Sequence, residues 1–384
     1  MNAIKSVLRR ISFGAALLLV SIYSAHAQTN EIRVGVLLAL SGPAAYLGTP
    51  VQQSLQLLVD HYNADGGIAG RKLVLVTYDT EGNTGKAVQL FRRLVESDMV
   101  QVVIGPSTTG ESLAIGPIAE ELKVPMISFG AGRDIVLPVK QNSFKVPPTD
   151  EIEIRQLLRD FARRGIRKIG VIATAGPYGQ SAEALLKRYA PTAGIDIVAF
   201  EEYQALDTDL TAQIVRVRDS NPDALLIWAT DPGATLLVKQ AAALGFKKPV
   251  FNSPAVADPK FIAKAGPAAE GTYVQSSRLL VAADLPDSDP QKAGLVWLTR
   301  AYRKRFGEEP PQNSGHPYDA LLLIEQGLKQ LRSDGVGSLA KAMEKAKFCG
   351  ANGCFQMSAL DHNGLPPESM VILQARGGRW VLSQ

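Results

Sequence analysis

Residues 32–40, IRVGVLLAL, and residues 72–78, KLVLVTY, flank the segment 51–63, VQQSLQLLVDHYN. The two outer segments are nearly continuous apolar runs, which is typical of strands buried on both faces. The middle segment carries apolar residues at helical spacing, and Gly66-Gly67 behind it can end a helix. A strand, a helix and a second strand in this order predict a parallel βαβ unit.

The same alternation continues beyond this unit and restarts after Pro147-Pro148. Two successive α/β units predict two lobes with a cleft between them, and such clefts are preferred ligand sites. Residues 287–348 are expected to be mostly helical, and 371–373 and 380–382 to be strands. The other predicted strands are 100–104, 125–128, 168–173, 195–201, 224–228 and 250–251, and the other predicted helices are 86–96, 112–122, 150–164, 180–189, 209–219 and 234–244.

The first 27 residues have the pattern of a secretory signal peptide. A basic start precedes an apolar stretch over 11–23, and Ala25-His26-Ala27 places small residues before the cleavage point. The apolar stretch is shorter than the roughly 20 residues that a membrane-spanning helix needs. We therefore expect export to the periplasm, cleavage before Gln28, and no segment embedded in a membrane.

Charge and composition argue against a nucleic-acid partner. Removal of residues 1–27 takes away three basic residues and lowers the formal net charge from +4 to +1. No Lys/Arg cluster of the size that nucleic-acid binding requires is left. A hydrophobic content of 46% is sufficient for a packed core, which at this length should divide between two lobes.

The two cysteines, Cys349 and Cys354, enclose a Gly-Ala-Asn-Gly turn sequence. In an exported protein this pattern favours a disulfide that closes a small loop. Metal binding is the alternative, but two thiols without a nearby His make a poor zinc site. We expect the disulfide and no metal.

Motifs of catalysis and of cofactor binding are absent. The sequence has no Gly-x-Ser-x-Gly elbow, no His-Glu-x-x-His pair and no Walker phosphate loop. Gly130-Ala131-Gly132 begins a dinucleotide-like pattern, but Ile135 occupies the place of its third glycine. We therefore expect no catalytic residues and no cofactor.

The segment from Ile104 to Ser112, IGPSTTGES, follows a predicted buried strand and opens a predicted helix. The first turn of a helix offers unpaired N–H groups and a partial positive charge, and Ser and Thr hydroxyls add donors. The segment therefore predicts a cradle for a carboxylate group. The alternative is that the hydroxyl groups only cap the helix.

Several short motifs recur in the order and spacing of one protein family. The motifs are Ser41-Gly42-Pro43, Asp65-Gly66-Gly67-Ile68-Ala69-Gly70, Ile104-Gly105-Pro106-Ser107, Gly176-Pro177-Tyr178-Gly179 and Tyr318-Asp319-Ala320. On these motifs the chain resembles the periplasmic branched-chain (hydrophobic) amino-acid binding proteins of ABC transporters over essentially its whole mature length.

The resemblance implies the type I periplasmic binding protein fold, with two Rossmann-like α/β lobes joined by three crossing segments and a ligand cleft between them. One lobe would comprise 28–148 and 277–348, and the other 149–276 and 349–384. The implied function is capture of a small carboxylate ligand by a monomeric protein that delivers it to an inner-membrane ABC permease. A sensor module of a receptor is the alternative function.

The same resemblance places the ligand site residue by residue. The carboxylate cradle falls on Ser107, Thr108 and Thr109, and an aromatic residue that covers the ligand falls on Tyr178. Tyr46 is close to a second family aromatic, and Gly130, which follows the predicted strand 125–128, is included in the ligand site.

Three positions depart from the family pattern, because Gly132 replaces a Thr, Thr230 replaces a Tyr, and Pro254 replaces the acidic partner of the ligand ammonium group. Asp231 could substitute for this acid, or Arg133 could reinforce the binding of an anion that has no amine. A capping Asp231 and a solvent-facing Arg133 are equally compatible with the sequence. The ligand is therefore either an amino acid or an aromatic or other organic acid without an amine.

Overall fold

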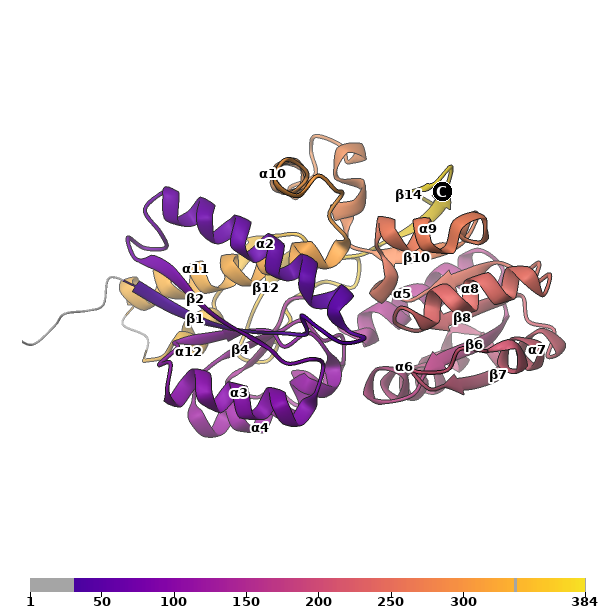
Figure 1. Ribbon diagram of the computed structural model, residues 1–384, viewed down its shortest axis with the longest axis horizontal. Helices are drawn as coiled ribbons and strands as arrows, with labels where there is room; N and C mark the ends of the chain where they lie inside the picture. The colour runs from indigo at the N-terminus through magenta and orange to yellow at the C-terminus, as the bar shows by residue number, and fades with distance from the viewer. Residues whose placement is uncertain (1–30, 335–336, 384) are drawn as a thin grey trace, which may run out of the picture.

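The structure is a computed structural model that describes residues 31–334 and 337–383, so the predicted signal peptide lies outside the described residues. Two α/β lobes lie side by side along the long axis of the molecule (Figure 1). Within the described ranges, none of the helices combines the length and the apolar character that a membrane span needs.

The first lobe is built on a five-stranded sheet in the order β2-β1-β3-β4-β5, and all of its pairs are parallel. Val34 and Val36 pack into the core on one face, and Leu37 packs into the core on the other. This two-sided burial explains why β1 is an almost unbroken apolar run. The elements are β1 (Glu31–Leu38), α2 (Ala45–Ala64), β2 (Lys72–Asp79), α3 (Thr84–Glu96), β3 (Val102–Ile104), α4 (Thr109–Leu122), β4 (Met126–Ser128) and β5 (Ser143–Lys145).

The second lobe is built on a seven-stranded sheet in the order β14-β13-β10-β9-β8-β6-β7. Its strands from β10 to β7 are parallel, and β13 and β14 from the end of the chain extend it as antiparallel strands. The elements are α5 (Asp150–Arg163), β6 (Lys168–Thr174), α6 (Pro177–Tyr189), β7 (Asp196–Tyr203), α7 (Thr211–Asp219), β8 (Ala224–Trp228), α8 (Gly233–Ala243), β9 (Val250–Asn252), α9 (Pro259–Ala265), β10 (Tyr273–Ser276), β13 (Val371–Arg376) and β14 (Arg379–Leu382).

After β10 the chain returns to the first lobe, where α11 lies beside α2 (Figure 1). The elements of this return are α10 (Lys292–Phe306), α11 (His316–Asp334), α12 (Leu339–Met343), β11 (Lys347–Cys349) and β12 (Cys354–Gln356). Ala351, Phe355 and Leu365 pack into the core of the first lobe. The lobe boundaries stay a prediction, and this packing favours moving the segment 349–365 from the second lobe to the first.

The predicted elements are present, but three helices begin at least three residues earlier than predicted. The helix predicted from Val51 begins at Ala45, the one predicted from Ser112 begins at Thr109, and the one predicted from Gln180 begins at Pro177. Proline at the first helical position explains the last case, because proline is favoured there. The early turns carry polar and aromatic residues, which have no apolar periodicity and therefore escape a prediction based on it.

Candidate functional site

A cavity of about 120 Å³ lies between the two lobes. It lies at the carboxyl ends of the parallel strands, which is where open α/β sheets bind their ligands. The residues that line it are Tyr46, Leu47, Ser107, Thr108, Thr109, Phe129, Gly130, Ala131, Pro147, Glu153, Tyr178, Thr230, Pro254, Ala255, Ala257, Asp258, Gln312, Asn313 and His316. We call this cavity the interlobe pocket.

Several helices begin at the interlobe pocket. Tyr46 lies in the first turn of α2, Thr109 in that of α4, Tyr178 in that of α6, and His316 is the first residue of α11. The amino ends of helices carry a partial positive charge and unpaired N–H groups. The backbone around the pocket therefore favours an anionic group.

The hydroxyl groups of Ser107 and Thr109 can donate to a ligand carboxylate. Ser107 Oγ accepts a hydrogen bond from the N–H of Ala39 at 3.1 Å, and Thr109 Oγ1 accepts one from the N–H of Gly132 at 3.2 Å. Because both oxygens act as acceptors in these bonds, each hydroxyl proton is left for a ligand.

Thr108 has a different role from its two neighbours. Its hydroxyl donates to Glu111 Oε2 at 2.7 Å and accepts from the N–H of Glu111, and Glu111 Oε2 accepts from the N–H of Thr108. This reciprocal arrangement is a capping box, which commits the Thr108 hydroxyl to the start of α4. The predicted cradle therefore reduces to Ser107 and Thr109, with Thr108 holding the helix.

Two aromatic side chains face the pocket from opposite lobes. Tyr178 packs against Trp228 with the ring centroids 5.4 Å apart. Burial, together with the neighbouring Glu153, raises the pKa of Tyr178 well above its ordinary value. Burial and the charge of Asp231 likewise raise the pKa of Tyr46, so both phenols stay neutral at physiological pH.

Glu153, which sequence reasoning missed, lies in the first turn of α5 and lines the pocket with only 3% of its surface exposed. Its Oε2 atom has no hydrogen-bond partner among the described residues. Burial raises the pKa of Glu153 to about 8, and the charge of Lys145 offsets part of this effect.

A second acid and a neutral histidine complete the polar lining. Asp258 is the N-cap of α9, its Oδ1 accepts from the N–H of Lys260 at 2.7 Å, and burial raises its pKa. Burial also lowers the pKa of His316 to about 3, so its ring is neutral. Asn352 Nδ2 lies 3.0 Å from Nδ1 of this ring, and an amide nitrogen donates, which places the ring proton on Nε2.

A comparison with known families decides what kind of protein carries this pocket. The model of the periplasmic binding protein family matches residues 31–379, which is nearly all of the described chain. The chain belongs to this family. It is therefore a solute-binding protein and not an enzyme.

Individual relatives agree with this assignment. The Leu/Ile/Val-binding protein homolog 8 of Brucella suis is 27% identical over 336 residues, which cover 80% of this binding protein and 78% of the relative. An extracellular ligand-binding receptor from Rhodopseudomonas palustris has a similar structure, with a TM-score of 0.85, 28% identity, and coverage of 92% of this chain and 99% of the other.

Two further structures share the fold and differ in their ligands. A branched-chain amino-acid transporter binding protein from Streptococcus pneumoniae, solved with isoleucine, has a TM-score of 0.79 at 24% identity, covering 91% of this binding protein and 97% of that chain. An ABC transporter solute-binding protein from R. palustris, solved with benzoate, has a TM-score of 0.79 at 23% identity, covering 92% and 95%.

Three residues predicted for the site do not line the interlobe pocket of this binding protein. Asp231 pairs with Lys264 at 2.9 Å and accepts from the hydroxyl of Thr235, so its charge is already compensated. Arg133 pairs with Glu151 at 2.8 Å. Neither the substitute acid nor the anion-binding arginine that the sequence left open is therefore directed at the pocket.

Gly132, the third of these residues, lies against Thr109 of the cradle instead of lining the pocket. A Cβ atom at this position would lie 2.5 Å from Cγ2 of Thr109. Gly130 has a comparable role, since a Cβ there would lie 2.9 Å from the backbone of Thr109. The two glycines let the loop approach Thr109 closely, whereas Pro254 and Thr230 line the pocket.

The disulfide expected between Cys349 and Cys354 is formed and closes the β11–β12 hairpin. Asp319 organises the loop, because its carboxylate accepts from the backbone N–H groups of Ala351 and Asn352. Since Asn352 also contacts His316, the loop is connected to one wall of the interlobe pocket.

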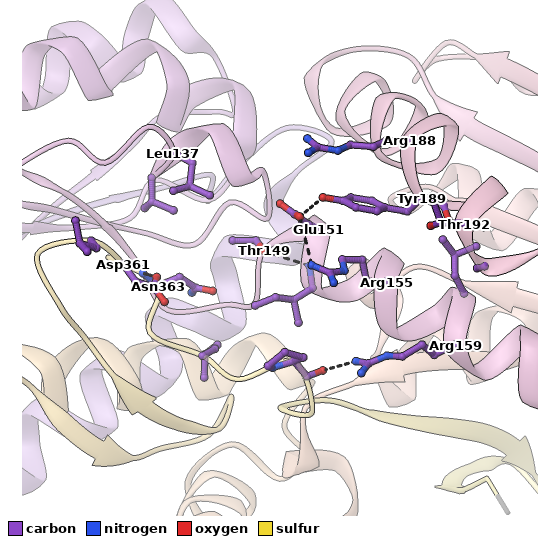
Figure 2. A pocket seen from close by; sticks show the side chains of 17 residues that line it. Leu137, Thr149, Glu151, Arg155, Arg159, Arg188, Tyr189, Thr192, Asp361 and Asn363 are labelled. Carbon is purple, nitrogen blue, oxygen red and sulfur yellow. Dashed lines mark hydrogen bonds and ion pairs between the residues drawn. The ribbon is translucent and has the colours of Figure 1, made fainter.

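A larger groove of about 780 Å³ lies elsewhere, between α5, the end of α6 and the segment around 360–367 (Figure 2). We call it the outer groove. Its charged side chains contact one another or the backbone: Glu151 pairs with Arg155, and Arg159 donates to the carbonyl oxygen of Pro367 (Figure 2). The guanidinium of Arg188 lies 5.2 Å from the ring centre of Tyr189.

Proposed function

We propose that this protein is the solute-binding component of an ABC uptake transporter and captures a small carboxylate-bearing ligand in the interlobe pocket. The observation that carries the proposal is the pair of free hydroxyl donors, Ser107 and Thr109, at the start of α4 in a pocket lined by both lobes. Binding between the lobes favours their closed arrangement, which a permease can distinguish from the open one.

The proposal also covers where the protein works. The basic start, the apolar stretch and Ala25-His26-Ala27 direct export to the periplasm. There the protein acts as a monomer and hands its ligand to an inner-membrane permease. The two fold relatives were solved with isoleucine and with benzoate. These ligands represent the two classes of solute considered for this site, an amino acid and an organic acid without an amine.

A thermal-shift screen tests this function directly. A ligand present at 100 times its Kd stabilises the folded protein by about 2.7 kcal/mol. The double variant Thr109→Ala with Tyr178→Ala should bind the identified ligand more weakly by roughly 100-fold or more, because it loses a donor and an aromatic wall.

The matched control is Thr192→Ala with Tyr189→Ala, which removes the same two residue types from the outer groove. This control should keep the wild-type affinity, and the melting temperature of each ligand-free variant shows whether it folds. Unchanged affinity in the Thr109/Tyr178 variant would refute the site.

A further inference from the structure

Of the two carboxyl groups in the pocket wall, Glu153 and Asp258, only that of Glu153 has an oxygen atom without a partner in the described part of the chain. Oε2 accepts no hydrogen bond, and no salt bridge to Glu153 is found in residues 31–334 and 337–383. A buried carboxylate without compensation is costly, so such groups are normally paired. Because Glu153 has no such partner within the described chain, the expected partner is a group of the bound ligand.

The nearby cation, Lys145, offsets the charge of Glu153 only in part and forms no salt bridge with it within the described residues. Lys145 on β5 is fully buried, and its ammonium group donates to the carbonyl oxygens of Ala131 at 2.9 Å and Pro148 at 2.7 Å. Asp150, one turn before Glu153, adds a second negative charge. No Lys or Arg lines the described pocket, while Glu153 and Asp258 both do.

The acid is structurally connected to the carboxylate cradle. The N–H of Gly132 donates to Thr109, and the N–H of the next residue, Arg133, donates to Asp150 at 2.9 Å. Asp150 and Glu153 are three residues apart on α5, which places them on the same side of the helix. A donor site for a carboxylate and an acceptor site for a cation therefore lie on adjoining segments of one pocket.

We infer that Glu153 accepts the ammonium group of the ligand, so that the solute is an α-amino acid and not a carboxylate without an amine. This inference rests on the proposed function. An α-amino acid carries both groups on one carbon atom, which matches two complementary sites on adjoining segments. A carboxylate without an amine would add a negative charge to a wall that already has two acids and leave Glu153 unpaired.

The competing arrangement is a protonated Glu153 that donates a hydrogen bond to an amine-free acid. The two arrangements predict opposite effects of pH, because one requires the ionised carboxyl group and the other the neutral one. The titratable groups that interact with Glu153 are Lys145 from β5, Asp150 from α5 and Tyr178 from α6. Asp258 before α9 and His316 from α11 line the same pocket.

The test is a calorimetric or thermal-shift panel of the proteinogenic amino acids, each beside its deamino acid. Leucine is paired with 4-methylpentanoate and phenylalanine with 3-phenylpropanoate, and benzoate is added. We expect binding by an amino acid and at least 30-fold weaker binding by its deamino partner, which corresponds to losing a buried charge pair.

Glu153→Gln should weaken amino-acid binding by roughly 30-fold or more while changing the affinity for the deamino acid by less than about threefold. Glu183→Gln, on an outer side of the same lobe where Glu183 pairs with Lys187, is the control and should bind like wild type. An unchanged or raised melting temperature of ligand-free Glu153→Gln shows that its defect is one of recognition and not of folding.

The outcomes separate the inference from the function on which it rests. Binding of benzoate or a deamino acid as tightly as any amino acid would overturn the inference and leave the proposed function standing. An amino-acid ligand whose affinity is unaffected by Glu153→Gln would also overturn it. Binding by no member of the panel would contradict the proposed function itself.

Discussion

The interlobe pocket and the outer groove differ in how their polar groups are satisfied. The outer groove is several times larger, about 780 Å³ against about 120 Å³. Its acid Glu151 contacts Arg133, Arg155 and the hydroxyl of Tyr189. Two residues further along the same helix, Glu153 faces the smaller pocket and has no partner in the described chain.

Cavity volume is therefore a poor guide to the binding site of this protein. A groove whose charges already compensate one another has little to gain from a polar ligand. A pocket with free hydroxyl donors and an acid that has no hydrogen-bond or salt-bridge partner gains both a hydrogen-bonded carboxylate and a charge pair when a zwitterion enters. The polar groups without partners, and not the volume of the cavity, therefore indicate the class of the ligand.

The largest expected effect is a loss of ligand affinity when a single hydroxyl group is removed from the interlobe pocket. Thr109→Val keeps the shape that packs against Gly132 but removes the donor to the ligand carboxylate. We expect about 2–3 kcal/mol of lost binding free energy, because the lost hydrogen bond involves a charged group. Isothermal titration measures it, and Thr192→Val in the outer groove should lose less than about 0.5 kcal/mol.

The next effect concerns the stability of the ligand-free protein. Burial raises the pKa of Glu153 from 4.5 to about 8, so the folded state binds more protons than the unfolded state between these values. The destabilisation caused by Glu153 is therefore absent below pH 4.5, grows as pH rises, and is complete above about pH 8. Glu153→Gln should be more stable than wild type by roughly 2 kcal/mol at pH 8.

Urea unfolding of both proteins at pH 4.5 and pH 8 checks this expectation. Glu151→Gln provides the contrast, because Glu151 is paired and its loss should destabilise the protein by about 0.5–1 kcal/mol. A Glu153→Gln variant that is less stable than wild type at pH 8 would mean that the acid has a structural partner.

The smallest expected effect is a modest loss of ligand affinity when Gly132, which lies against Thr109 of the cradle, is substituted. Gly132→Ala adds a Cβ atom that would lie 2.5 Å from Cγ2 of Thr109, so the Thr109 side chain must shift. We expect affinity to fall by roughly 3- to 10-fold, equivalent to about 1 kcal/mol, with the melting temperature little changed. Wild-type affinity in this variant would show that the position of Thr109 does not limit binding.

The sequence was sufficient for much of the fold, and it led to the proposal for one half of the pocket. Two-sided burial produces the apolar runs that predict β1 and β2, and the Ser/Thr segment at the start of α4 predicts the cradle. Local pattern carries this information because each feature depends on neighbours along the chain.

The acidic half of the pocket could not be predicted in this way. Asp150, Glu151 and Glu153 are three acids at one helix start, where the helix dipole favours any of them. Which of them faces the pocket depends on packing against the other lobe. In the same way, the partners of Asp231 and Arg133 are Lys264 and Glu151, which are distant in sequence and could not be paired from local pattern.

The most direct test of the central claim is the number of protons exchanged on binding. Titration of the amino-acid ligand at pH 7, in two buffers of different ionisation enthalpy, measures this number. Because the pKa of Glu153 is about 8 without ligand, pairing with an ammonium group should release close to one proton per ligand, and Glu153→Gln should release almost none. Proton uptake, or equal release by wild type and Glu153→Gln, would contradict the account.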